Sequence, residues 1–401
     1  MLPIGVDSIS SEKIPRFRNV VDALDALRPS SPVYVIIPSA FRAATGRFSS
    51  EFDGETMYAV KANHAPPILD QVYAAGVRRF DVASMGEVKA IHSRFQDAAM
   101  SFMAPIRLRD SARQAYHLYG IRDFALDSEE ELHAILRETG AATSRQSAQE
   151  LTLFVRADVP GHGALVSFSR KFGANVEQSC QLLKAIAAHG ARPALTFHVG
   201  SQCMDPEAYS RALDICGKII ACADVKLAAL DIGGGFPSYY QNITTPPLES
   251  YYDAIRKGIR RLGLPSDTAL RCEPGRALVA DGISTIVQVI ARRGQKLMIN
   301  DGIFGSLNEY SLENWPARYP LRAFHASPDG SLVERREAKE SFTVFGPTCD
   351  SLDVLRYPLE IPAEISTGDW IVFDKCGAYS CALRTTFNGF YPDIFVEAES
   401  T

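Results

Sequence analysis

The stretch DIGGGFP, residues 231–237, decides how the fold of the chain is interpreted. A short apolar run, 227–230, precedes it and is typical of a buried parallel strand. Three consecutive glycines, 233–235, then leave backbone N–H groups without neighbouring Cβ atoms, so these groups can close around a phosphate. A glycine triplet alone is more typical of a flexible turn. The surrounding sequence favours a phosphate site, because polar residues follow several other strand-like runs.

Seven further runs share the length and apolar character of the run before the glycines, and helical patterns separate them. Eight β-then-α units over about 240 residues predict an α/β protein with a (β/α)8, TIM-like barrel. A doubly wound parallel sheet is the alternative, which periodicity alone does not exclude. The eight runs are 57–61, 79–83, 100–104, 123–126, 151–156, 194–199, 227–232 and 269–273.

A barrel of this kind carries its chemistry at the C-terminal ends of its strands. A lysine at the end of a buried strand is costly unless it is paired or used, because its charge must leave water. Each polar strand end taken alone is more often structural than functional, but their convergence on one barrel mouth favours a site. The residues at these ends are Lys61, Asp81, Ser84, Arg156, His198, the glycine triplet and Glu273.

Composition excludes several classes of protein. The chain has 401 residues, 46% of them hydrophobic and 22% charged, which is ordinary for a globular protein of this size. A net charge of -5 without a basic tract argues against nucleic-acid binding, and no apolar run predicts a membrane helix. The N-terminus lacks the pattern of a signal peptide. Eight scattered cysteines without a CxxC pair predict reduced thiols, no metal site and a cytoplasmic location.

The composition changes beyond about residue 277, where β-forming runs are separated by turns instead of long helices. This pattern predicts a C-terminal antiparallel β domain. We therefore expect three parts: a lead-in over 1–35 that packs on the β domain, the barrel over 36–276, and the β domain over 277–401.

Nine motifs of the chain occur in the order typical of one known family, and together they span about residues 35 to 395. The chain resembles the ornithine/diaminopimelate/arginine decarboxylases, the fold-type III enzymes that use pyridoxal 5′-phosphate. Two of the motifs look closest to those of ornithine and lysine decarboxylases. The nine motifs are YAVKAN, FDVAS, KFG, HVGSQ, DIGGGFP, EPGR, GPTCDSLD, GAYS and FNGF.

The resemblance implies a role for each residue of the expected cofactor site. Lys61 would form the Schiff base, Glu273 would keep the pyridine nitrogen protonated, and His198 would stack on the ring. Each role has a structural alternative: Lys61 could lie on the surface, His198 could be a hydrogen-bonded core histidine, and Arg276 could form an ordinary ion pair. The other residues implied to line the pocket or hold the phosphate are Asp81, Ser84, Arg156, Ser201, Gly233, Gly234, Gly235, Gly275, Arg276 and Tyr379.

Three residues of the C-terminal part are implied to contact the substrate. Cys349, from the partner subunit of a homodimer with shared active sites, would protonate the carbanion left after CO2 departs. Asp350 beside it would hold the distal ammonium, although a solvated loop aspartate is an equal alternative. Glu313 stands where an aspartate is usual in ornithine decarboxylases, and its longer side chain would shorten the pocket and favour ornithine over lysine.

The predicted function is decarboxylation of a basic amino acid, first L-ornithine to putrescine and CO2, within polyamine biosynthesis. Lysine or an N-acylated diamino acid is the alternative substrate. An amino-acid racemase and a non-catalytic regulator resembling antizyme inhibitors remain as other classes. The motifs GPTCDSLD and EPGR speak against a racemase, and the joint presence of Lys61, Glu273 and Cys349 speaks against a regulator.

Overall fold

The structure, a computed structural model, describes residues 14–161, 163–168, 171–391 and 393–401. Eight parallel strands close into a barrel in the order β3-β4-β5-β6-β7-β9-β11-β12. Each of the eight predicted runs overlaps one of these strands, so the barrel is confirmed and the doubly wound sheet is excluded. The strands are β3 (Glu55–Ala59), β4 (Arg79–Val82), β5 (Ala99–Phe102), β6 (Asp123–Leu126), β7 (Thr152–Arg156), β9 (Arg192–Thr196), β11 (Ala229–Asp231) and β12 (Ala269–Cys272).

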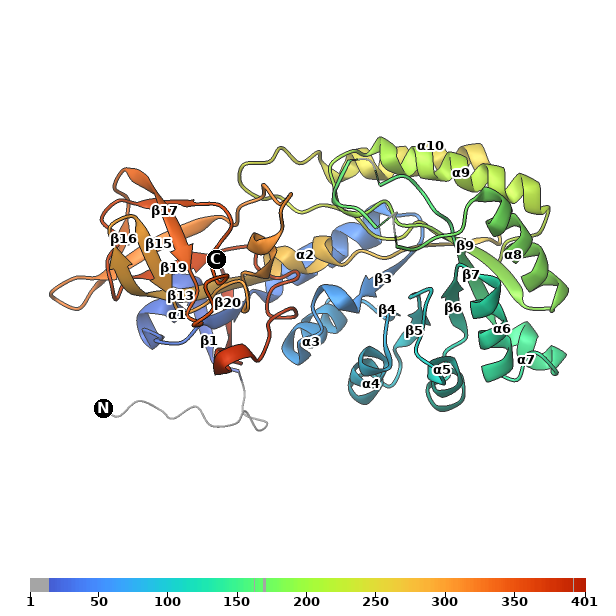
Figure 1. Cartoon of the computed structure of the whole chain (residues 1–401), viewed down its shortest axis with the longest axis horizontal. Helices are drawn as coiled ribbons and strands as arrows, with labels where there is room; N and C mark the ends of the chain where they lie inside the picture. The colour runs from blue at the N-terminus through green and yellow to red at the C-terminus, as the bar shows by residue number, and fades with distance from the viewer. Residues whose placement is uncertain (1–13, 162, 169–170, 392) are drawn as a thin grey trace.

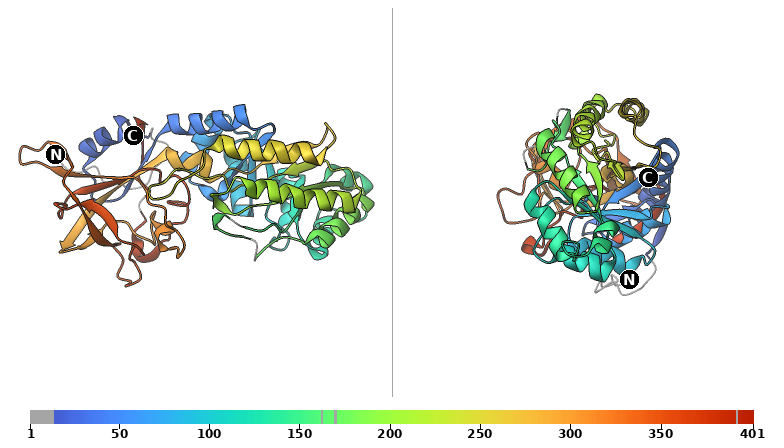
Figure 2. Two further views of the ribbon diagram at one scale, coloured as in Figure 1. Left: turned by 90° about the horizontal axis from the view of Figure 1, so that it is seen from above. Right: turned by 90° about the vertical axis from the view of Figure 1, so that its right-hand side faces the viewer.

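Helices surround the barrel strands, as the end-on view in Figure 2 shows. Most of these strand residues are buried, as expected for a parallel sheet covered by helices. Within the described ranges, no helix is both long and apolar enough to cross a membrane. The helices are α2 (Pro38–Glu51), α3 (Pro66–Ala74), α4 (Met85–Arg94), α5 (Ser111–Tyr119), α6 (Glu129–Glu138), α7 (Arg145–Glu150), α8 (Val176–Ala188), α9 (Glu207–Ala223), α10 (Leu248–Leu262) and the short α11 (Arg276–Val279). A two-stranded ribbon, β8 (Ala164–Val166) with β10 (Ser201–Cys203), lies beside the barrel strands.

A second sheet of ten strands forms a separate body beside the barrel (Figure 1). It is mixed and not purely antiparallel as predicted, because β1–β20, β2–β20 and β14–β17 are parallel pairs. Chain segments from both ends of the sequence meet in it, which places β1 and β20 side by side. Its elements are β1 (Arg16–Asn19), α1 (Val20–Leu27), β2 (Val33–Ile36), β13 (Ile283–Arg293), β14 (Lys296–Ile299), β15 (Leu321–Ala326), β16 (Leu332–Arg335), β17 (Lys339–Phe345), β18 (Leu359–Pro362), β19 (Trp370–Phe373) and β20 (Phe395–Ser400).

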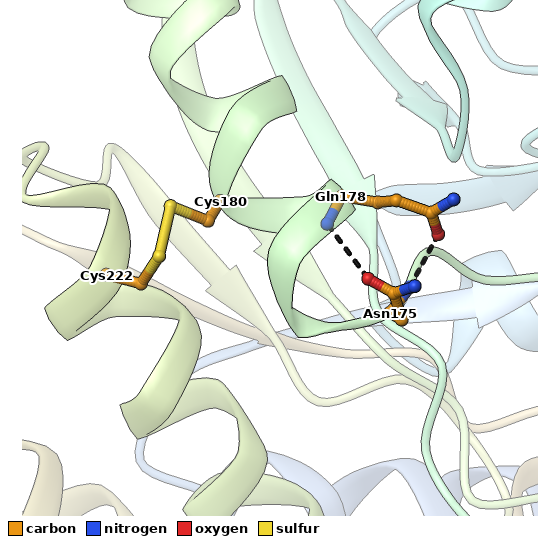
Figure 3. Close-up of a disulfide and its surroundings, with 4 residues drawn as sticks. All are labelled: Asn175, Gln178, Cys180 and Cys222. Carbon is orange, nitrogen blue, oxygen red and sulfur yellow. Dashed lines mark hydrogen bonds between the residues drawn. A yellow bond between two sulfur atoms is a disulfide. The ribbon is translucent and has the colours of Figure 1, made fainter.

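A disulfide joins α8 to α9 on the outside of the barrel (Figure 3). It links Cys180 to Cys222, whose Cα atoms lie 5.8 Å apart, within the range that a disulfide requires. The prediction that all thiols are reduced is therefore wrong, and the cysteines give no support to a cytoplasmic location. The six free cysteines are Cys203, Cys216, Cys272, Cys349, Cys376 and Cys381.

The wrong prediction has a structural cause. The two cysteines are 42 residues apart in the sequence and sit on separate helices, so no local motif announces the pair. Helix α8 begins at a capping box in which Asn175 and Gln178 exchange side-chain and backbone hydrogen bonds, and this fixes where Cys180 falls on the helix (Figure 3).

Candidate active site

Lys61 lies just beyond β3, in the 3-10 turn η1 (Val60–Ala62), and not on the strand itself. The hydroxyl of Tyr58 donates to the carbonyl of Asn63 at 2.8 Å and closes this turn. The neighbours Val60 and Ala62 are fully buried, whereas the Lys61 side chain remains 38% exposed. The backbone is thus anchored in the core while the amine faces the C-terminal mouth of the barrel.

Two buried carboxylates, Asp81 and Glu273, act on the amine of Lys61. Asp81, at the end of β4, places its Oδ2 3.4 Å from Nζ. Burial opposes a charge on Lys61, but Asp81 and then Glu273 favour it more, so the pKa of Lys61 is raised. Burial first, and then the charges of Asp231 and Asp81, raises the pKa of Glu273. This group of like charges follows the pattern of functional sites, where carboxylates are held close despite their repulsion.

Asp231 was quoted in the sequence only as the start of the glycine motif, and its position gives it a role in the site. It is fully buried, and burial raises its pKa. Its carboxylate accepts hydrogen bonds from the Gly233 N–H at 2.9 Å and from the Thr196 hydroxyl at 3.1 Å. Asp231 therefore orients the first glycine of the triplet and adds negative charge beside Glu273.

Ser84 and Glu87 open helix α4 at the same mouth. The Ser84 hydroxyl accepts the Glu87 backbone N–H at 3.2 Å, so in this chain it is engaged as a helix cap. The Glu87 carboxylate accepts the Ala83 N–H at 2.6 Å, and burial raises the pKa of Glu87 to about 6. Asp81 also raises this pKa and Lys61 lowers it, which places Glu87 in the electrostatic field of the site. The sequence interpretation missed Glu87 because a glutamate in the first turn of a helix is common.

His198 lies two residues beyond β9. Its Nδ1 accepts the Gly200 N–H at 3.0 Å, and the ring of Phe168 packs edge-on at 5.1 Å between centroids. Burial, and then the charges of Lys61 and Arg156, lowers the pKa of His198 well below its ordinary value. The imidazole is therefore neutral at pH 7, which suits a flat surface for stacking better than proton transfer. Arg156 ends β7, with its guanidinium 5.5 Å from the ring centre of Phe172.

The glycine triplet packs where no side chain fits. A Cβ on Gly233 would lie 2.0 Å from the Phe197 carbonyl oxygen, and one on Gly235 would lie 2.4 Å from the Gly200 carbonyl oxygen. Both glycines have positive φ, +67° and +106°. A Cβ on Gly234 would lie 3.0 Å from Nε2 of His198. The triplet thus brings bare backbone to the histidine, although the N–H of Gly233 itself is taken by Asp231.

Arg276 lies beside this cradle, at the start of α11, with 3% of its side chain exposed. Its Nη2 is 3.5 Å from the hydroxyl of Ser201, and the Tyr379 ring packs 4.8 Å from the guanidinium. Tyr379, with φ of +52°, donates its N–H to the carbonyl of Ala62 at 2.8 Å, next to Lys61. The backbone at Gly275 also lies close to Ala62. A Cβ added to Gly275 would lie only 2.8 Å from the Cβ of Ala62, so a glycine is needed there.

These residues fit a pyridoxal 5′-phosphate molecule by the chemistry of their donors and acceptors. Arg276 has a buried Nε for which no acceptor exists among the described residues, as expected of a donor that awaits an anion. The Ser201 hydroxyl lies 3.5 Å from Nη2 of the same guanidinium. Lys61 supplies an amine and Glu273 a buried carboxylate of raised pKa. The structure brings most of the predicted residues together, whereas the Ser84 hydroxyl is engaged as the cap of α4.

Cys349, Asp350 and Glu313 lie elsewhere on the chain. The Sγ of Cys349 is exposed and lies 3.2 Å from the Asn388 side-chain oxygen, which also accepts the Cys349 N–H. Asp350 caps its own loop by accepting the Leu352 N–H at 2.8 Å. Glu313 is 75% exposed and pairs with Arg356 in the loop between β17 and β18. Within the described part of one chain, no contact joins these three residues to Lys61.

Asp353 stabilises the loop that carries Cys349, a role that the sequence did not reveal. Asp353 is buried and accepts hydrogen bonds from the Thr348 N–H and hydroxyl and from the Ile303 N–H, at 2.7 to 3.1 Å. Its carboxylate also occupies the space in which a side chain on Gly346 would lie. Cys349 is therefore presented to solvent on a well-supported turn.

A (β/α)8 barrel with a lysine at its first strand end and a glycine cradle after its seventh defines the class of pyridoxal-phosphate enzymes built on a barrel and a β domain. Residues 37–280 match the family described as "Pyridoxal-dependent decarboxylase, pyridoxal binding domain". The chain belongs to this family, and pyridoxal 5′-phosphate is its cofactor.

Comparison with individual relatives supports decarboxylation of a basic amino acid. A lysine/ornithine decarboxylase of Selenomonas ruminantium is 33% identical over 351 residues, covering 85% of this chain and 83% of that one. The ornithine decarboxylase of Caenorhabditis elegans is 29% identical over 84% of this chain and 79% of its own. Antizyme inhibitor 2 of Xenopus laevis is also 29% identical, over 83% of this chain and 73% of its own.

Solved structures agree in fold over most of the chain. A mutant of the protein called SrLDC in complex with PLP superposes with a TM-score of 0.80 at 29% identity, and 96% of each chain is covered. A Paramecium bursaria Chlorella virus arginine decarboxylase bound to agmatine has a TM-score of 0.79 at 25% identity, with 94% of this chain and 99% of the other covered. The relatives thus include decarboxylases named for lysine, ornithine and arginine.

Proposed function

We propose that the chain decarboxylates L-ornithine to putrescine and CO2, in a homodimer whose two chains share each active site. The observation that carries this proposal is the position of Lys61, whose amine lies 3.4 Å from buried Asp81 at a barrel mouth that also holds a phosphate cradle. A regulator that only binds partners has no need for this arrangement. Putrescine is a diamine, so the proposed pathway is polyamine biosynthesis.

The chain's own residues divide the work at this site. When bound, pyridoxal 5′-phosphate supplies the electron sink into which the electrons of the Cα–carboxylate bond move as CO2 leaves. Lys61 would hold the cofactor through Nζ, and Glu273 would face its ring nitrogen. His198 would cover one ring face as a neutral imidazole. Arg276, Ser201 and the backbone of Gly234 and Gly235 would hold the phosphate, while the Gly233 N–H donates to Asp231.

The sharing of sites is supported by the exposed loop that carries Cys349. In one chain this thiol has no contact with Lys61, and apolar side chains stand exposed near it: Leu352 at 68%, Phe387 at 40% and Phe390 at 46%. An exposed apolar group of this kind is typical of a surface that a partner covers. A second copy related by a two-fold axis would bury these side chains and bring Cys349 and Asp350 to the opposite Lys61.

The choice of ornithine over lysine depends on Glu313. If its carboxylate faces the distal ammonium, the extra methylene relative to aspartate shortens the pocket. In the single chain Glu313 pairs instead with Arg356 at 3.3 Å, and the Tyr357 hydroxyl donates to its carbonyl. Both side chains of the pair are substantially exposed, so the attraction is weak and a substrate ammonium can compete for the carboxylate.

The proposal is tested by CO2 release from ornithine, lysine, arginine, meso-diaminopimelate and N-acylated ornithine, each with racemisation measured in parallel. We expect the highest kcat/KM for ornithine and no racemisation. Lys61→Ala should abolish turnover, whereas Lys226→Ala, at an exposed lysine outside the site, should not. Release of CO2 from no substrate would favour a regulator, and a preference for another substrate would overturn the assignment of ornithine.

A further inference from the structure

Arg276 and Glu309 form an ion pair that is almost completely buried, with side chains 3% and 4% exposed. Both terminal nitrogens of the guanidinium take part, Nη2 donating to Oε1 at 2.5 Å and Nη1 to Oε2 at 2.9 Å. A buried pair of this kind gives little net stability over apolar residues, because both charges lose their hydration. Its presence in this position therefore calls for another explanation.

Other residues in the described part of the chain contact the rest of the guanidinium and leave only one edge free for a ligand. Nη1 donates to the hydroxyl of Tyr240 at 2.9 Å, and the rings of Trp315 and Tyr379 lie 4.7 and 4.8 Å from its centre. The remaining edge consists of Nε, which is buried without an acceptor among the described residues, and the side of Nη2 near Ser201. Two parallel N–H groups on one edge match the geometry of a phosphate.

Glu309 is itself held in place from a different element. It lies in the 3-10 turn η3 (Asn308–Ser311), and the hydroxyl of Tyr319 donates to its Oε2 at 3.0 Å. Its carboxylate thus accepts three hydrogen bonds, two from Arg276 and one from Tyr319. The carboxylate is fixed on the side of the guanidinium away from Nε.

We infer that Glu309 is a positioning residue for the cofactor phosphate: it holds Arg276 so that the Nε edge faces Ser201. The inference rests on the proposed role of Arg276 in phosphate binding. In Glu309→Gln, an amide N–H₂ replaces one acceptor and faces a guanidinium N–H, so the guanidinium turns away from the cradle. If Arg276 instead kept its position, the loss of a nearby negative charge would tighten phosphate binding. The direction of the change therefore separates positioning from simple charge repulsion.

The test compares pyridoxal 5′-phosphate with pyridoxal, which lacks the phosphate but keeps the aldehyde and ring. Binding of each to the cofactor-free full-length protein is measured by absorbance titration. For Glu309→Gln we expect the affinity for pyridoxal 5′-phosphate to fall about tenfold or more, with the affinity for pyridoxal unchanged. Tyr319→Phe removes only the support of the carboxylate and should give a smaller loss of the same kind, which serves if the first variant does not fold.

Asp369→Asn is the matched control, because Asp369 forms a buried pair with Arg335 at 2.7 Å in the β domain. It should destabilise the protein without changing the ratio of the two affinities. Equal losses for both ligands in Glu309→Gln would show a structural role only and overturn the inference. Unchanged or tighter binding of pyridoxal 5′-phosphate would overturn it as well. A wild-type protein that does not distinguish the two ligands would overturn the phosphate site itself, a result that is separate from any measurement of CO2 release.

Discussion

At the scale of the residue, the protonation of Lys61 is the most consequential feature of the site. Asp81 and Glu273 overcome the effect of burial and raise the pKa of Lys61, so the amine is protonated at neutral pH in the cofactor-free protein. Only the free amine can attack an aldehyde. The same carboxylates that suit the bound cofactor therefore slow its first attachment.

This leads to a prediction about pH. The free-amine fraction of a lysine below its pKa grows about tenfold per pH unit, so attachment of pyridoxal 5′-phosphate, trapped with borohydride, should accelerate steadily through neutral pH. Asp81→Asn removes the nearest negative charge, lowers the pKa of Lys61 and should speed attachment at pH 7. The Lys226→Ala variant should behave as wild type. A plateau in the wild-type rate below about pH 9 would contradict the raised pKa.

The residues that sequence reasoning placed in the site were those inside compact motifs. Lys61, Glu273 and Arg276 stand in YAVKAN and EPGR, where an unusual charge beside strand residues marks them. Glu309 and Asp353 could not be identified in this way, because the side chain of a loop carboxylate is usually exposed to solvent. Only their partners, 33 residues away for Glu309 and up to 50 for Asp353, show that they are buried and engaged.

At the scale of the element, the eight barrel strands were predictable because each combines an apolar run with a following helical pattern. The turn η1 was not predictable from the sequence. Its backbone contacts Gly275 and Tyr379, which lie far along the chain. The mixed character of the second sheet was also hidden. The parallel pairing of β1 with β20 joins the two ends of the chain, and no local pattern encodes such a pairing.

Two glycines with similar φ offer a matched prediction about the glycine cradle. Gly233 and Gly263 have φ of +67° and +58°, but a Cβ meets the Phe197 oxygen at 2.0 Å only at Gly233. Gly263→Ala should lower the free energy of unfolding by about 1–2 kcal/mol, the cost of the backbone conformation. Gly233→Ala should lose about 1–3 kcal/mol more from the close contact. Equal losses in urea unfolding would contradict the packing described for the cradle.

The disulfide predicts how many free thiols the denatured chain has. Denatured in the absence of a reductant, the chain should expose six thiols to a thiol reagent, and eight after reduction. Because the bridge spans 42 residues, loop entropy assigns it about 3–4 kcal/mol of stability, so reductant should lower the Tm. Cys222→Ser should make the Tm insensitive to reductant. Eight thiols without reduction would show that α8 and α9 are not bridged.

At the scale of the whole molecule, the proposed dimer would combine the barrel mouth of one chain with the Cys349 loop of the other. The barrel holds Lys61, Glu273 and the glycine triplet, and the loop carries an exposed thiol among exposed apolar side chains. Association of two chains about a two-fold axis produces two equivalent composite sites. The central claim is therefore that a chain on its own is inactive.

The most direct measurement mixes two inactive variants, Lys61→Ala and Cys349→Ala, under conditions in which chains exchange. Random pairing makes about half of the dimers mixed, and each mixed dimer has one intact site and one that lacks both residues. Activity should recover to about a quarter of wild type, with tagged chains showing that exchange took place. Cys216→Ala, at a buried cysteine outside the site, is the control. Mixing it with Lys61→Ala should give no more activity than Cys216→Ala has alone. Confirmed exchange with activity remaining at the level of the two separate variants would contradict the shared site, and Lys61 and Cys349 would then act within one chain.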